Sequence, residues 1–142
     1  DNIKLFFKRA SQHFDYIIVD GGQTFSEILI TVFDYSNLVL LVATPDILSV
    51  YQMKWCLEVL RSLQFPLKMV KFVLNRSESR GSVAWQEVRG ALTCEIFGHI
   101  PSDGKVVGTA LNKGIPCVID EPRSKVAEAF TKRKFVHSCD GN

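Results

Sequence analysis

Short apolar runs bounded by polar turn residues recur along the chain and predict buried β-strands. They cover residues 14–19, 37–43, 69–74 and 95–100. Mostly apolar runs of this length, rather than strictly alternating ones, are typical of strands buried on both faces, as in parallel sheets. Four strands are therefore predicted.

Between these runs, apolar residues repeat every three or four positions, which predicts helices. The clearest helix follows residues 37–43, with Thr44 as the expected N-cap and Pro45 at the first helical position. Its stripe comprises Ile47, Val50, Met53, Leu57 and Leu60. Further helices are expected over residues 25–33, 82–92, 103–112 and 124–132.

The alternation of strands and helices predicts an α/β fold with a doubly wound, mostly parallel sheet and helices on both faces. Gly114 and Pro116 supply the stop signal for the helix over residues 103–112. Ligands in such sheets bind beyond the carboxyl ends of the strands, so candidate functional residues are sought in the turns that follow each strand.

Composition supports one ordinary globular domain. Of the 142 residues, 46% are hydrophobic and 23% charged, and the net charge is +2. This small charge excludes the strong basic footprint typical of nucleic-acid binding, so no nucleic-acid partner is expected. The longest apolar runs are too short to span a bilayer.

The four cysteines, at positions 56, 94, 117 and 139, form no Cys-x-x-Cys pair and match no zinc template. Cys56 and Cys117 lie in apolar stretches, so both are expected to act as small core hydrophobes. We expect reduced thiols and a cytoplasmic location. No signal peptide is recognised, and the absence of an initiator Met is consistent with a fragment.

Asp20 ends the first predicted strand and is the first candidate for chemistry. A carboxylate aimed from the end of a buried strand suits a hydrated Mg²⁺ beside a terminal phosphate. Gly21 and Gly22 would allow close backbone approach, and Gln23 could orient water. The alternative is that Asp20 only caps the next turn.

Two later turns are candidates for the base side of a nucleotide site. Asn75, followed by Arg76, ends the run over residues 69–74, and its amide could pair with an adenine edge or simply form a turn. Pro101 fixes an extended turn that could line a base pocket, while Ser102 or Asp103 could cap the following helix.

No phosphate-binding loop is present in the sequence. The phosphate loop of P-loop enzymes has four residues between its glycines and a hydroxyl residue after the Gly-Lys pair. The segment from Gly98 to Val106 has five intervening residues and ends in a valine, so it is rejected. His13, His99 and His137 lack the neighbours needed for metal or nucleophilic chemistry.

Basic residues gather near the end of the chain against the single acid Glu128. Cations that favour the C-terminal end of a surface helix explain this cluster. A membrane-surface contact is the less favoured interpretation, because the accompanying apolar stripe is short. The basic residues are Arg123, Lys125, Lys132, Arg133 and Lys134.

Five motifs in order resemble the second half of MinD/ParA-type ATPases, most closely the CpaE/TadZ-like proteins. They are FDYIIVDGGQTFSEI, NLVLLVATPDILSVYQMK, FVLNR, IFGHIPSDGKVVGTALNKGIPCV and EPRSKVAEAF, and they cover about residues 10–130. The resemblance implies residues 1–133 as the C-terminal part of a P-loop-type ATPase domain that lacks the first strand and the phosphate loop. Residues 134–142 have no counterpart and are expected to be a disordered tail.

The resemblance further implies an ATP- and Mg²⁺-dependent switch that dimerises around nucleotide and recruits protein partners to position pilus or secretion machinery. Asp20 then matches the Mg²⁺-side carboxylate, and Gly21, Gly22 and Gln23 match the switch loop. Many relatives have proline at position 22 or 23, which is a departure here. Asn75 matches the adenine contact.

By the same resemblance, residues 101–103 (Pro101, Ser102 and Asp103) match the adenine-side loop of these ATPases. Residues 44–49 match a segment that in relatives lies near the dimer and partner face. Without a phosphate loop, the 142-residue chain alone is expected to bind ATP poorly and to hydrolyse none. Two alternatives remain: a non-hydrolysing scaffold or localisation protein on the same fold, and a receiver-like domain, for which only Asp20 fits.

Overall fold

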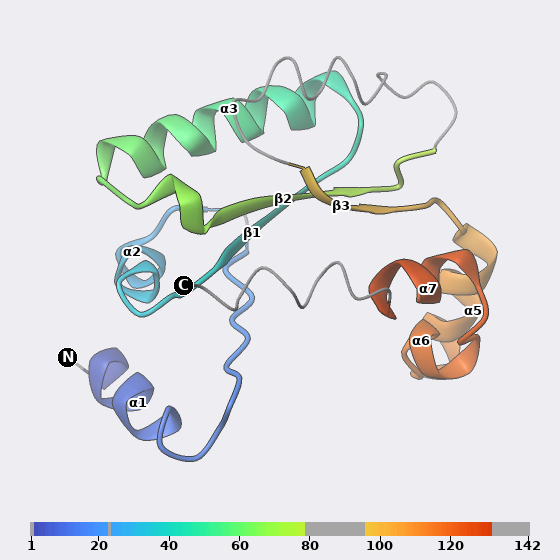
Figure 1. Ribbon diagram of the computed structural model, residues 1–142, viewed down its shortest axis with the longest axis horizontal. Helices are drawn as coiled ribbons and strands as arrows, with labels where there is room; N and C mark the ends of the chain where they lie inside the picture. The colour runs from blue at the N-terminus through green and yellow to red at the C-terminus, as the bar shows by residue number, and fades with distance from the viewer. Residues whose placement is uncertain (1, 23, 79–95, 132–142) are drawn as a thin grey trace. The chain divides into compact units, whose positions relative to one another are not determined.

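The computed structural model describes residues 2–22, 24–78 and 96–131 (Figure 1). The chain divides after Val39 into two compact units.

Within its described residues, the first unit has two helices, α1 (Asn2–Ala10) and α2 (Glu27–Phe33), which contact each other. The ring of Phe7 is buried and stacks on Tyr35, with 5.3 Å between centroids and 7° between ring planes. The Ser26 hydroxyl accepts a hydrogen bond from Leu29 N and begins α2. The helix predicted over residues 25–33 is confirmed, whereas α1 was not predicted from the sequence.

The strand predicted over residues 14–19 is wrong. This segment is extended but joins no ladder among the described residues. The side chains of Phe14, Tyr16 and Ile18 are 65%, 86% and 94% exposed. An apolar run becomes a strand only when a neighbouring strand takes up its backbone N–H and C=O groups and covers its side chains.

Three other predicted strands are confirmed and form one sheet in the order β1 (Val39–Ala43), β2 (Val70–Asn75) and β3 (Ile96–Ile100). Strands β2 and β3 are parallel, and an irregularity between Phe72 and Val73 shifts their register. Parallel strands alternating with helices confirm the predicted α/β fold class.

Helix α3 (Ile47–Ser62) begins at Asp46, so the prediction of Thr44 as N-cap and Pro45 as first helical residue is wrong. The Asp46 carboxylate accepts a hydrogen bond from Ser49 N at 2.9 Å, a geometry that an N-cap at Thr44 would not provide. A short 3₁₀ turn, η1 (Leu67–Met69), leads from the end of α3 into β2.

The described part of the second unit also contains the helices α5 (Gly104–Lys113), α6 (Cys117–Asp120) and α7 (Lys125–Thr131). The stop signal predicted for the first of them is confirmed, because Gly114 adopts the left-handed conformation (φ 66°) after α5. The ammonium of Lys113 pairs with the Asp120 carboxylate at 2.8 Å and links α5 to α6. Helix α7 contacts both α6 and β3.

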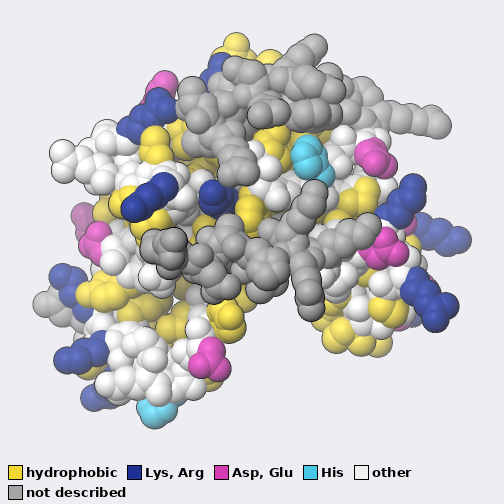
Figure 2. Space-filling model, in the orientation of Figure 1, with side chains coloured by type: hydrophobic (Ala, Val, Ile, Leu, Met, Phe, Trp, Pro, Cys, Tyr) yellow, Lys and Arg dark blue, Asp and Glu magenta, His cyan; other side chains and the backbone are white. Residues whose placement is uncertain are grey.

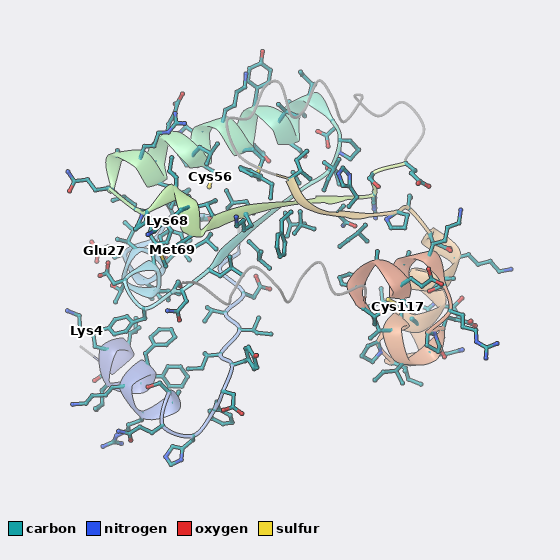
Figure 3. The ribbon with its side chains drawn as sticks, viewed as in Figure 1. Lys4, Glu27, Cys56, Lys68, Met69 and Cys117 are labelled. Atoms are coloured by element: carbon teal, nitrogen blue, oxygen red, sulfur yellow. The ribbon has the colours of Figure 1, made fainter. Side chains whose placement is uncertain are left out.

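The core of the second unit includes Val73 of β2, Ile100 of β3 and Val126 of α7, with Phe97 and Cys117 packed against them. Figure 3 labels the thiols of Cys56 on α3 and Cys117 on α6, and both are free and half-buried. Burial raises the pKa of the Cys56 thiol, as expected for a small apolar residue rather than a reactive one.

Several predictions lie outside the described residues: the helix over residues 82–92, Cys94, the tail over residues 134–142 and Gln23. None of the helices in the described ranges combines the length with the apolar composition that a membrane span requires.

We predict that Leu60→Ala lowers the free energy of unfolding by roughly 2–5 kcal/mol, because Leu60 is fully buried and alanine leaves a cavity. Urea denaturation followed by circular dichroism would measure it. The matched control is Leu111→Ala on α5, where the side chain is 78% exposed and a change within about 0.5 kcal/mol is expected. Equal effects of the two substitutions would contradict the described burial.

Candidate functional site

The turns after β2 and β3 lie together, as predicted for the carboxyl edge of a parallel pair. Asn75 is the register partner of Ile100. The carbonyl oxygen of Ile100 accepts hydrogen bonds from Ser77 N at 3.0 Å and from Ser77 Oγ at 3.3 Å. The structure therefore brings the Asn75 turn beside the segment that begins at Pro101. The hydrogen bonds of Ser77 connect the two, and this residue was not predicted from the sequence.

Arg76 has a left-handed backbone conformation, with φ 54°. This conformation costs about 1–2 kcal/mol for a residue with a side chain. The side-chain carbonyl of Asn75 accepts a hydrogen bond from Arg76 N at 3.0 Å, which helps to hold the turn. Since that carbonyl is engaged, the NH₂ of Asn75 is the group best able to meet the acceptor edge of a bound base.

The loop after β3 ends in a helix cap. Asp103 Oδ1 accepts a hydrogen bond from Val106 N at 3.0 Å, so Asp103 rather than Ser102 is the N-cap of α5. Pro101 is partly buried and Ser102 is exposed. A carboxylate used as a helix cap is less available to a ligand, whereas the Ser102 hydroxyl faces solvent.

The turn after β1 carries a hydrogen-bonded network that the sequence analysis missed. Asp46 accepts from the hydroxyls of Thr44 and Ser49 and from the backbone N of Ser49. The hydrogen bond from Thr44, followed by those from Ser49, lowers the pKa of the Asp46 carboxyl below 3.8. The sequence signal for this N-cap was Asp46 itself, a polar residue directly before the first residue of the helical apolar stripe.

The loop after residues 14–19 belongs to the first unit. Asp20 is exposed, and its Oδ1 accepts a hydrogen bond from Gly22 N at 3.0 Å. Gly22 has φ 67°, a conformation that favours glycine, and a Cβ on Gly21 would lie 2.8 Å from Leu29 Cδ1, so the Leu29 side chain would have to move to admit a side chain at position 21. The predicted convergence of Asp20 with Asn75 and Pro101 stays a prediction.

The Asp20 loop fits a single-carboxylate contact with Mg²⁺. One carboxylate oxygen is held by Gly22 N, which leaves the other, Oδ2, for a hydrated cation. Mg²⁺ usually keeps several waters and binds through one or two carboxylates together with phosphate oxygens. In the described part of the chain, no group of three or more His, Cys, Asp or Glu side chains could hold a metal by itself.

No family model matches the chain, and neither does any curated protein. Solved structures do. A ParA family ATPase from Chlorobium tepidum TLS superposes with a TM-score of 0.84 at 21% identity, over 92% of this chain and 53% of that one. The fold is that of the ParA and MinD ATPases.

Two MinD structures are similar in the same way. MinD from Pyrococcus furiosus gives a TM-score of 0.78 at 24% identity, over 94% of this chain and 56% of that one. MinD from Pyrococcus horikoshii OT3, complexed with Mg-ADP, gives 0.75 at 22% identity, over 91% and 52%. The chain therefore spans about half the length of the structures it matches.

We predict that Asp46→Ala lowers the free energy of unfolding by about 1 kcal/mol near neutral pH, because the cap of α3 is lost. The folded-state pKa of Asp46 is depressed, so its contribution is present above the ordinary value of 3.8 and is lost as pH falls through the folded-state pKa.

Urea denaturation between about pH 6 and about pH 3 would measure the free energy of unfolding of both proteins. The difference between wild type and Asp46→Ala should become smaller as the pH falls. Asp34→Ala, at an exposed aspartate that follows α2, is the matched control, with a change within about 0.5 kcal/mol. A gap that widens toward low pH would contradict the assignment.

Proposed function

We propose that this chain is part of an ATP-binding and ATP-hydrolysing molecular switch of the MinD/ParA type. The single observation that carries the proposal is the match to a ParA family ATPase over 92% of this chain but only 53% of the other. On this proposal, a segment outside the present sequence supplies the phosphate-binding loop and a strand beside it.

The predicted roles follow the turns at the strand ends. The NH₂ of Asn75, the left-handed turn at Arg76 and the loop at Pro101 and Ser102 would line the base side of the nucleotide, with Asp103 holding the start of α5. Their support is the hydrogen-bonded contact between the two turns through Ser77 and Ile100. Bound Mg²⁺ would neutralise phosphate charge, and Asp20 Oδ2 would hold it.

The hydrolytic step would depend on the loop that starts at Asp20. Gly21 and Gly22 allow the backbone to approach a terminal phosphate without side-chain obstruction. Gln23 would orient the attacking water. The support for this division of roles is the hydrogen bond that Gly22 N donates to Oδ1 of Asp20, because it engages only one of the two carboxylate oxygens.

The cellular role that we propose comes from the motif order rather than from the fold. The order and wording of the five motifs favour a CpaE/TadZ-like protein of the cytoplasm that forms a nucleotide-dependent homodimer. Such a dimer would recruit protein partners for the positioning or assembly of pilus or secretion machinery.

We predict that, in a protein that joins this chain to its phosphate loop, Asp20→Ala reduces ATP turnover to background while leaving the melting temperature within a few degrees. The reason is that Asp20 is exposed and contributes only a local turn to the fold. Phosphate release would be measured. Asp15→Ala, at an exposed aspartate in the same extended segment, is the control and should retain activity.

Undiminished turnover in Asp20→Ala would contradict the catalytic assignment. If the wild-type joined protein binds ATP without turnover, the scaffold alternative replaces the ATPase.

We also predict that the 142-residue chain alone shows no shift in melting temperature with Mg-ATP. A ligand at 100 times its Kd would stabilise by about 2.7 kcal/mol, so binding would be visible. Differential scanning fluorimetry with Mg-ATP and Mg-GTP would check this, with the joined protein as positive control. A clear shift in the chain alone would mean that it builds a phosphate site of its own.

A further inference from the structure

The loop that starts at Asp20 rests on the first turn of helix α2. The Leu29 side chain occupies the space that a side chain at position 21 would take, because a Cβ added to Gly21 would lie 2.8 Å from Leu29 Cδ1 and 3.8 Å from Leu29 Cδ2. Leu29 is half-buried, whereas residues 20–22 are exposed. The contact between Gly21 and Leu29 therefore joins an exposed loop to a helix.

Hydrogen bonds do little to fix this loop against the rest of the described chain. The bond from Gly22 N to Asp20 Oδ1 lies within the loop, and no backbone hydrogen bond connects residues 20–22 with another described segment. A loop closed by one local hydrogen bond keeps much of its conformational freedom. The apolar contact from Leu29 therefore restricts where the loop, and with it the Asp20 carboxylate, can lie.

Helix α2 gives this contact a firm support. Leu29 N donates a hydrogen bond to Ser26 Oγ at 3.2 Å, so the backbone of Leu29 belongs to the capped first turn. Val32, three positions further on the same side of the helix, is buried, and α2 contacts α1. Figure 2 shows hydrophobic side chains gathered around these two helices, at the lower left. Leu29 is thus held at its backbone while its side chain reaches the loop.

We propose that Leu29 is a positioning residue for the hydrolytic step: its side chain holds the backbone at Gly21, and this sets the direction of the Asp20 carboxylate. The inference rests on the proposed ATPase function, in which Asp20 Oδ2 holds Mg²⁺. Leu29 is apolar and acts through Gly21. A misplacement of about 1 Å can lower a rate by about 100-fold, so a contact that fixes the loop can control turnover without supplying a reacting atom.

The competing explanation is that Leu29 packs for stability alone. In that case Leu29→Ala would lower the melting temperature and leave the turnover of the folded protein unchanged. A positioning role instead changes kcat and the dependence of turnover on Mg²⁺ at a temperature where the variant is fully folded. The two explanations therefore predict different kinetics for the same substitution.

The first test measures ATP turnover in the protein that joins this chain to its phosphate loop. We expect Leu29→Ala to lower kcat by about tenfold and to raise the Mg²⁺ concentration for half-maximal turnover, with the KM for ATP within about twofold of wild type. Leu29→Met, which keeps the reach of the side chain, should keep kcat within about twofold. Ile28→Ala, at a 63% exposed position of the same helical turn, is the control and should match wild type.

A double substitution tests whether the contact with Gly21 carries the effect. The methyl group of Gly21→Ala would displace the Leu29 side chain, so Leu29→Ala should have little further effect in a Gly21→Ala background. A comparison within that background cancels any direct obstruction of the phosphate by the methyl group. The same tenfold loss in both backgrounds would overturn the proposal, and so would unchanged turnover when Leu29→Ala is the single substitution.

The loop can also be followed in the 142-residue chain without nucleotide. The NMR order parameter of the Gly22 amide should fall from about 0.85 to about 0.6 or less in Leu29→Ala and stay unchanged in Ile28→Ala. Equal order at Gly22 in wild type and Leu29→Ala would overturn the proposal. A joined wild-type protein without turnover would overturn the proposed ATPase instead, while a loss of order at Gly22 in Leu29→Ala would still support the positioning of the loop by Leu29.

Discussion

The parallel pairing of β2 with β3 is the constraint on which the second unit depends. It sets Asn75 beside Ile100, and the two hydrogen bonds from Ser77 to the Ile100 carbonyl extend the pairing one turn beyond the strands. The same pairing places Val73 and Ile100 where Val126 of α7 can cover them. A single alignment of two strands thus serves both the core and the edge at which ligands bind in α/β sheets.

Much of this unit could be predicted from the sequence because its signals are local. The runs that became β1, β2 and β3 are mostly apolar, and Gly114 followed by Pro116 is an unambiguous end for α5. The error at Thr44 has a local cause as well. Three adjacent residues, Thr44, Pro45 and Asp46, each suit a helix start. Asp46 is the N-cap because its carboxylate accepts hydrogen bonds from both Thr44 and Ser49.

The first unit was predicted less well because its structure depends on neighbours rather than on local pattern. Residues 14–19 have the composition of a buried strand, yet Tyr16 and Ile18 are almost fully exposed and join no ladder among the described residues. The hydrophobic pattern shows that a segment is compatible with a buried strand. It does not show whether a neighbouring strand is there to pair with it. Helix α1 was missed although its apolar residues Ile3, Phe6, Phe7 and Ala10 recur at three- and four-residue steps, which is a local helical signal.

The close approach of Gly21 to Leu29 has a consequence for how this chain can vary. A methyl group at position 21 would lie 2.8 Å from Leu29 Cδ1, which is the end of a flexible side chain. Alanine at position 21 therefore needs another rotamer of Leu29 or a shorter residue at position 29. The choice of residue in this loop is thus coupled to the side-chain conformation in the first turn of α2.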